Sequence, residues 1–200
     1  YFSTNQIPHN FKPNSTPNKY LNFLDGCKLT KEQIDSLFYF TAYTLLPELC
    51  MSIFLIKLGT GANGKSVDNV ILEEVVGPEN CSKLTLDQLS GENRFSLAEL
   101  KNKLLCIVEE LQSDKYYRVD LLKAITSNAE IYIEEKGIQG KKYKLGVKIC
   151  IASNYDIKSR DKSNGFNRRK RYVSFENVVK ESDQNPALLT SDYWNNDGET

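Results

Sequence analysis

Residues 52–66 read Ser-Ile-Phe-Leu-Ile-Lys-Leu-Gly-Thr-Gly-Ala-Asn-Gly-Lys-Ser, and this segment carries the strongest indication of the fold class. Its first half, residues 52–58, is short and mostly apolar, which is typical of a buried β-strand. Its second half has the pattern Gly-x-x-x-x-Gly-Lys-Ser in full. A helix-like run follows from Lys65 to Val76, and Gly77 is well placed to cap its C-terminal end. A strand, a glycine-rich turn and a helix in immediate succession are the context that a phosphate-binding loop requires.

Each residue type in this loop suits phosphate binding. The glycines let the backbone wrap a phosphate with its N–H groups, and the N-terminus of the following helix adds a partial positive charge. We expect Lys65 to reach the β- and γ-phosphates of a nucleotide, and Ser66 to ligate Mg²⁺. The alternative is a chance glycine-rich turn, which the flanking strand and helix disfavour. The candidate nucleotide-binding residues are Gly59, Thr60, Gly61, Ala62, Asn63, Gly64, Lys65 and Ser66.

The rest of the chain continues the alternation of strands and helices. Upstream, Thr30 is placed to cap a helix over about residues 31–47, after an extended leader over residues 1–20 that is rich in Asn, Pro, Ser and Thr. Buried strands that alternate with helices predict an α/β sandwich with a mostly parallel central sheet. The downstream elements are predicted strands at 104–108, 149–152 and 172–175 and a predicted helix at 119–127.

One stretch breaks this alternation. Residues 131–135 and 143–145 have the pattern of two short strands, and residues 136–142 between them contain two glycines and three lysines. This predicts a β-hairpin, inserted between two core strands, with a basic tip. A cationic tip binds a polyanion such as DNA by releasing its counterions, and a solvated tip is the alternative. The candidate DNA-binding residues are Lys136, Lys141 and Lys142.

Polar side chains follow two of the predicted strands. Glu109 and Glu110 come directly after residues 104–108. We expect the first carboxylate to hold Mg²⁺ and the second to orient the attacking water or accept its proton. Asn154 follows the next core strand, at the crevice where open α/β sheets bind ligands, and can hydrogen-bond the γ-phosphate or the attacking water. Taken singly, the Glu pair marks a strand end and the Asn a turn; downstream of the phosphate-binding loop they predict a catalytic site.

The charge of the chain is unevenly distributed. The sequence has 26 basic and 26 acidic residues, but residues 136–171 contain twelve Lys or Arg and only two acidic residues. Such a segment attracts phosphate, or else forms a solvated face. Within it, Arg168 and Arg169 have three interpretations: a DNA contact, an arginine that reaches the ATP of a neighbouring subunit, and a solvated sheet edge.

Cysteine usage and hydropathy exclude other classes of protein. The five cysteines are scattered without a Cys-x-x-Cys pair, and His9 is the only histidine. A structural zinc site needs four nitrogen or sulfur ligands, so we expect none. Unpaired cysteines suit a reducing compartment. The sequence has neither a signal peptide nor an apolar run of membrane-spanning length, and we expect a cytoplasmic protein with no membrane partner.

In their order along the chain, these motifs resemble those of the superfamily 3 DNA helicases, especially the helicase half of the primase–helicases of phages, plasmids and other mobile elements. The resemblance covers about residues 8–176. It departs from the family at residues 128–130, where a Gly-Asp pair is usual, and after Phe175, where the acidic tail matches nothing. The residues that match are the nucleotide-binding loop at 59–66 with its Asn63, the acidic pair Glu109 and Glu110, the Asn154 position, and the double arginine Arg168–Arg169 before Phe175.

The resemblance implies a P-loop NTPase with an AAA+-like three-layer sandwich, a short helical N-terminal segment and an inserted hairpin. Its cofactors would be ATP and Mg²⁺. Members of the family assemble as rings, usually hexamers, around single-stranded DNA and unwind a forked duplex alongside a primase domain or other replication proteins. Because ATP then lies between subunits, Arg168 or Arg169 would act on a neighbour's ATP.

From these patterns we expect three parts: a leader and helical segment over residues 1–48, an ATPase core over residues 49–178, and an unassigned polar tail over residues 179–200. Two other functions share the same loop. A small-molecule P-loop kinase would use Lys65 and Ser66 without needing a basic hairpin. A nucleotide-gated DNA-binding or initiator module would bind DNA without unwinding it alone.

Overall fold

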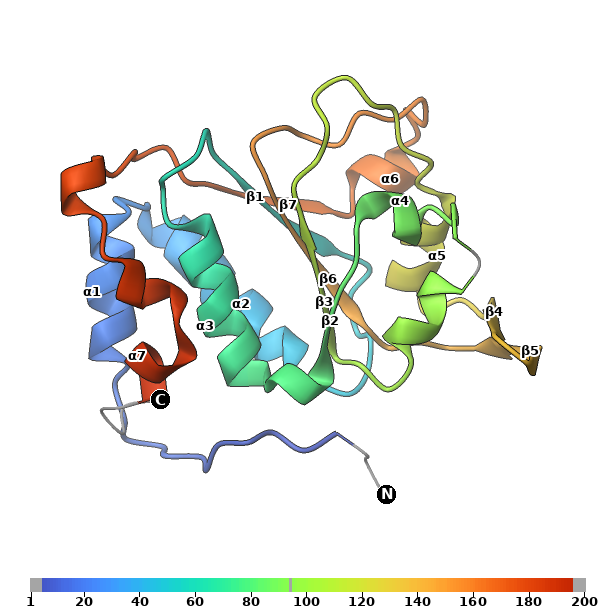
Figure 1. Ribbon diagram of the computed structural model, residues 1–200, viewed down its shortest axis with the longest axis horizontal. Helices are drawn as coiled ribbons and strands as arrows, with labels where there is room; N and C mark the ends of the chain where they lie inside the picture. The colour runs from blue at the N-terminus through green and yellow to red at the C-terminus, as the bar shows by residue number, and fades with distance from the viewer. Residues whose placement is uncertain (1–4, 94, 196–200) are drawn as a thin grey trace.

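A parallel sheet forms the centre of the fold in the computed structural model, which describes residues 5–93 and 95–195. The sheet has five strands in the order β2-β3-β6-β1-β7, and every neighbouring pair is parallel. β1 therefore lies between β6 and β7, in the interior of the sheet (Figure 1). The strands are β1 (Phe54–Leu58), β2 (Cys81–Lys83), β3 (Leu105–Glu109), β6 (Lys148–Ser153) and β7 (Lys170–Ser174).

Helices cover both faces of the sheet, which explains why its central strands are continuous apolar runs. All six residues of β6 are buried. One face packs against α1, α2 and α3, and the other against α4, α5 and the 3₁₀ turn η2 (Figure 1). The helices are α1 (Asn18–Gly26), α2 (Lys31–Thr44), α3 (Lys65–Val76), α4 (Leu86–Leu89), α5 (Asp120–Thr126), α6 (Asn164–Asn167) and α7 (Ser191–Asn195), and the short 3₁₀ turns are η1 (Pro78–Asn80), η2 (Ser96–Leu100), η3 (Glu181–Asp183) and η4 (Pro186–Leu189). The predicted three-layer α/β sandwich is confirmed.

Local signals fix the start of α2 and the end of α3, the helices that precede and follow β1 in the sequence. Thr30 caps α2 in a capping box, because its side chain accepts from the Gln33 backbone while the Gln33 side chain accepts from the Thr30 backbone. α3 ends where predicted: Gly77 takes φ = +90°, and its N–H donates to the Glu73 carbonyl over 2.8 Å. Both ends follow from a few neighbouring residues.

The N-terminal leader is shorter than predicted. α1 begins at Asn18, directly after Pro17, inside the stretch that the sequence predicted to be extended. Its one fully buried residue, Leu24, lies in the cluster on the α2 and α3 face of the sheet. Packing against segments remote in the sequence thus stabilises α1. The composition of residues 1–20, which is rich in Asn and Pro, does not indicate such packing.

The predicted hairpin is present between β3 and β6, but its tip is shorter than expected. β4 (Ile131–Glu135) pairs antiparallel with β5 (Ile138–Tyr143), so the turn is only Lys136–Gly137. Lys141 and Lys142 belong to β5, and their prediction as tip residues is wrong. The reason is Gly140, which lies so close to the Tyr132 side chain that an added Cβ would come within 2.5 Å of its Cζ and hydroxyl oxygen. Gly140 is a strand glycine at a close contact, not a turn glycine.

The C-terminal segment is packed, although its sequence is polar. After β7 the chain returns across the face formed by α1 and α3, where η4 and α7 contact α3 (Figure 1). Trp194 is 4% exposed, donates from Nε1 to the Leu188 carbonyl over 3.0 Å, and meets the Phe23 ring edge-on at 6.0 Å. One aromatic side chain thus anchors the segment.

The state of the cysteines and the length of the helices bear on the class of protein. All five cysteines are free, and four are buried and behave as small apolar side chains. Within the described ranges, no helix combines the length and the apolar character needed to cross a bilayer.

Candidate active site

A cavity of about 890 Å³ opens where β1, β3 and β6 end. Parallel strands bring their carboxyl ends to one edge of a sheet, so the residues that follow them converge there. Four parts of the chain line the cavity: the glycine-rich loop over residues 61–67, the strand ends at 109–111 and 152–155, the end of α1, and the C-terminal segment from Val179 to Leu189. The sequence predicted the first two of these parts.

The loop between β1 and α3 has the backbone of an anion-binding turn. Gly61, Ala62 and Gly64 take φ values of +113°, +47° and +94°. Glycine adopts this left-handed region freely, whereas a residue with a Cβ pays about 1–2 kcal/mol. Strained backbone of this kind concentrates where ligands bind. Ala62 therefore shares with the two glycines a backbone that supports the interpretation of this loop as a ligand site.

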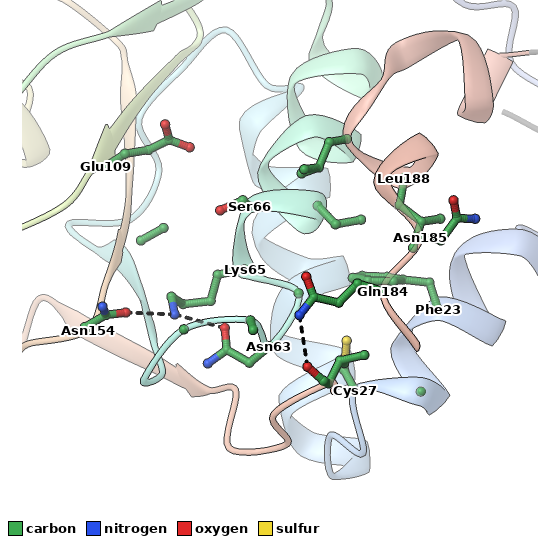
Figure 2. Close-up of a pocket in the computed structure, with 18 of the residues that line it drawn as sticks. Phe23, Cys27, Asn63, Lys65, Ser66, Glu109, Asn154, Gln184, Asn185 and Leu188 are labelled. Carbon is green, nitrogen blue, oxygen red and sulfur yellow. Dashed lines mark hydrogen bonds between the residues drawn. The ribbon is translucent and has the colours of Figure 1, made fainter. Parts of the chain in front are cut away.

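Lys65 lies over the loop with all its donors engaged. Its Nζ donates to the Gly59 carbonyl over 2.7 Å, to Asn63 Oδ1 over 2.9 Å and to Asn154 Oδ1 over 3.2 Å. Figure 2 shows the two amides on either side of the ammonium. Asn63 is fixed in turn, because its Nδ2 donates to the Phe175 carbonyl over 2.7 Å. Burial lowers the pKa of Lys65. A cation held by three neutral acceptors is suited to meet a phosphate.

The two predicted carboxylates lie at the end of β3. Glu109 is exposed, and its Oε1 accepts from Asn69 Nδ2 over 3.0 Å. Glu110 follows in the left-handed region at φ = +60°, where its N–H donates to the Ala152 carbonyl over 3.0 Å. Both glutamates and Ser66 line the same cavity. The structure thus brings Lys65, Ser66, the acidic pair and Asn154 together.

These donors fit Mg²⁺ bound together with a nucleotide. Mg²⁺ is usually held by one or two carboxylates and by phosphate oxygens, not by an all-protein cage. The hydroxyl of Ser66 and the carboxylate of Glu109 face one cavity beside the loop. Among the described residues no group of three or more His, Cys, Asp or Glu could hold a metal by itself. Any metal here would therefore depend on the phosphates.

The opposite wall of the cavity escaped the sequence-based prediction. Phe23 of α1 and Cys27, which directly follows α1, face Gln184 and Leu188 of the C-terminal segment across it (Figure 2). This segment is tied to the glycine-rich loop, because the N–H of Val179 donates to the Ala62 carbonyl over 2.7 Å. Burial, reinforced by Asp68, raises the pKa of the Cys27 thiol to about 12, so it stays neutral. No local signal could have indicated this wall, because it joins the two ends of the chain.

The double arginine does not reach the cavity. Arg169 is 8% exposed, and its guanidinium donates to the Gly165 carbonyl and to Ser127 Oγ of its own chain. Arg168 is exposed at the end of α6. The two arginines therefore differ in what they can contact, which the sequence alone does not show.

The basic residues between positions 136 and 171 do not form a single surface. Lys148 is fully buried and donates to the Leu46 carbonyl, and Lys170 pairs with Asp156 at 3.1 Å. The hairpin of β4 and β5 lies at the end of the molecule far from α1 and α7 (Figure 1), and it carries exposed cations. They are Lys136, Lys141 and Lys142.

Solved structures with a similar fold include the C-terminal region of NrS-1 and the JCV helicase. The first, in one of its apo forms, superposes with a TM-score of 0.67 at 20% identity, over 98% of this chain and 45% of that one. The second superposes with a TM-score of 0.52 at 14% identity, over 82% of this chain and 46% of that one. At such identities the likeness establishes the fold. The chain spans less than half the length of these two solved chains.

No curated protein matches the chain in sequence. One family model does match, over residues 58–169, which is more than half of the 200 residues. The matched range begins at the last residue of β1, includes the phosphate-binding loop, both glutamates and Asn154, and ends at Arg169. The chain therefore belongs to the family described as a family of unknown function, DUF5906.

Proposed function

We propose that this protein is the ATP-hydrolysing motor of a DNA helicase. One observation carries the proposal: Lys65 is held between Asn63 and Asn154 at 2.9 and 3.2 Å, at a cavity that Ser66, Glu109 and Glu110 also line. Phosphoryl transfer to water requires groups of these kinds around one cavity: a lysine, a hydroxyl, two carboxylates and an amide. The fold shared with a helicase chain supports the same function.

In this proposal each residue has one role. The loop N–H groups and Lys65 bind the β- and γ-phosphates, and Ser66 and Glu109 hold Mg²⁺, which neutralises charge on the phosphate oxygens. Glu110 orients the attacking water and accepts its proton. Asn154 holds Lys65 through its Oδ1 before ATP binds, and its Nδ2 is left to donate to the γ-phosphate or to the water.

The other wall of the cavity would receive the nucleoside. Its position next to the loop and its apolar surfaces, Phe23 and Leu188, suit the flat face of a base. Since Val179 is bonded to Ala62 of the loop, the C-terminal segment would shift whenever the loop does. The segment thus becomes part of the nucleotide site in this proposal.

The proposed partners are single-stranded and forked DNA and further copies of the chain in a ring, with a primase domain or other replication proteins beside it. The exposed hairpin lysines supply phosphate contacts, and their distance from the cavity leaves ATP binding independent of them. Of the two arginines, Arg168 is the one free to reach a neighbour's ATP, because the Arg169 guanidinium is engaged within its own chain.

The decisive experiment measures ATP hydrolysis with and without single-stranded DNA, for the wild-type chain and for Lys65→Ala. We expect DNA-stimulated hydrolysis in the first and none in the second, with an unchanged circular dichroism spectrum, because Lys65 contacts loop acceptors and not the core. Hydrolysis at the wild-type rate in Lys65→Ala would refute the assignment. Turnover that DNA does not change would favour a small-molecule kinase.

A DNA-binding or initiator module without independent unwinding is the second candidate. The observation in its favour is that the chain spans only 45–46% of the two solved chains that it resembles. In this alternative, unwinding depends on elements outside the matched part. Strand displacement on a forked duplex separates the two candidates. DNA-stimulated hydrolysis without displacement would support the module.

A further inference from the structure

A lysine is buried in the middle of the sheet, on the strand that leads into the phosphate-binding loop. Lys57 of β1 is 0% exposed. Removing a cation from water is costly unless it gains a counter-charge and hydrogen bonds. Lys57 gains both, because its ammonium pairs with Asp68 and donates to Asn69 Oδ1 over 2.8 Å. Burial by itself lowers the pKa of Lys57, but Asp68 and the neighbouring groups outweigh it and raise that pKa, so the lysine is charged.

Lys57 determines which way the Asn69 amide points. An ammonium can only donate, so the amide must turn its oxygen towards Lys57 and its NH₂ group away. That NH₂ group then donates to Glu109 Oε1 over 3.0 Å. Asn69 is 3% exposed, so water does not compete for the amide. Lys57 thus fixes the orientation of the buried Asn69 amide on one side. On the other side, the amide donates a hydrogen bond to the carboxylate at the end of β3.

The same network reaches α1. Asp68, beside Asn69 in the first turns of α3, accepts from the Tyr20 hydroxyl over 2.6 Å. Burial, followed by Asp68, raises the pKa of Tyr20, so its hydroxyl remains a neutral donor. The chain of contacts runs Tyr20, Asp68, Lys57, Asn69, Glu109, and every link in it is a hydrogen bond or an ion pair.

The last link restrains an exposed group. The buried NH₂ group of Asn69 needs a hydrogen-bond acceptor, and it donates to Glu109, which is exposed and could be solvated by water without the amide. A buried amide that donates to an exposed carboxylate instead restricts where that carboxylate points. Only one oxygen of Glu109 is occupied, which leaves Oε2 for a ligand.

We propose that Asn69 is a positioning residue for the metal site: it holds Oε1 of Glu109 so that Oε2 faces Mg²⁺ on the nucleotide, and Lys57 sets the direction of its amide. The proposal rests on the proposed function, since that function assigns Mg²⁺ to Glu109. Groups that orient metal ligands commonly change metal affinity 10–100-fold when they are removed.

The test measures metal binding directly. Mn²⁺ is titrated into the chain with saturating ATP and followed by electron paramagnetic resonance, for wild type, Asn69→Ala and Asn69→Gln. We expect Asn69→Ala to weaken Mn²⁺ binding about ten-fold or more, with ATP affinity in EDTA unchanged. Asn69→Gln keeps the amide and should recover most of the affinity. If Asn69→Ala does not fold, Asn69→Thr replaces it, because it keeps a hydroxyl oxygen on the side chain for Lys57 but removes the NH₂ donor to Glu109.

Asn80→Ala is the matched control. Asn80 is 4% exposed and donates to the Gln6 and Val76 carbonyls, so this variant also loses a buried amide, but it lies outside the cavity. It should lower the thermal midpoint and leave Mn²⁺ affinity unchanged. Wild-type Mn²⁺ affinity in folded Asn69→Ala, or an equal loss in Asn80→Ala, would overturn the proposal. Failure of the proposed function is a different result, in which the wild-type chain does not bind ATP at all.

Discussion

Replacing Gly59 with alanine should damage both stability and nucleotide binding, although only one methyl group is added. A Cβ at Gly59 would lie 1.9 Å from Asn63 Nδ2 and 2.4 Å from the Phe175 carbonyl oxygen. Both distances are far below any van der Waals contact. One of the two neighbours, the carbonyl, belongs to backbone and cannot simply rotate away.

The magnitude follows from what has to move. Forcing a methyl group into packed structure costs about 1–3 kcal/mol, and displacing Asn63 breaks its buried hydrogen bond to Phe175, which contributes about 1 kcal/mol. A loss of about 3 kcal/mol lowers the thermal midpoint of a chain of this size by about 6–12 °C. Asn63 also holds Lys65, so ATP binding should weaken in parallel.

The assay is thermal unfolding by circular dichroism together with titration of a fluorescent ATP analogue. Gly26→Ala is the matched control, because Gly26 lines the same cavity but its added Cβ would have nothing within 4 Å. We expect the control to stay within about 0.5 kcal/mol of wild type. A Gly59→Ala protein with the thermal midpoint and nucleotide affinity of wild type would show that the close packing of the loop against Phe175 is wrong.

Three further predictions concern the acids, the hairpin and a buried lysine. Glu110→Gln should bind ATP and Mg²⁺ but hydrolyse slowly, whereas Glu109→Gln should require more Mg²⁺; normal steady-state kinetics in both would locate the acidic site elsewhere. Replacing Lys141 and Lys142 together with Ala should weaken single-strand binding and flatten its salt dependence in fluorescence anisotropy, with basal hydrolysis kept; an unchanged slope would exclude β5 as the contact. Burial lowers the pKa of Lys148 to about 8. Between about pH 8 and the ordinary pKa of lysine, the unfolded chain therefore binds more protons than the folded chain. The free energy of unfolding should therefore gain a rising contribution as pH increases above 8, and Lys148→Met should remove it in urea titrations across that range.

Local chemistry made much of the core predictable. The loop between β1 and α3, the cap at Thr30 and the stop at Gly77 each depend on residues within a few positions of one another. The strands β1, β3 and β6 were found because apolar runs record burial on both faces of a sheet. Such signals also placed Glu109, Glu110 and Asn154 at strand ends, from which a common edge follows.

Other parts could not be predicted because they depend on segments that meet only in three dimensions. α1 and the C-terminal segment are held together by contacts between residues far apart in the sequence, such as Phe23 with Trp194. β2 is only three residues long, too short for a periodic pattern. The turn of the hairpin was misjudged because two glycines nearby looked alike, while only Gly137 has a left-handed backbone in the turn.

The fold class, the glycine-rich loop and the chain order of the candidate site residues could be predicted from the sequence, because short-range patterns specify elements and parallel strands must share an edge. Which side chains face one another follows from the tertiary structure alone. In the folded chain the Arg169 side chain points inward, whereas Arg168 is exposed. Lys57, a cation within an apolar run, donates to Asn69. The direction of a side chain depends on the register and packing of distant segments, and no local pattern in a single sequence records those.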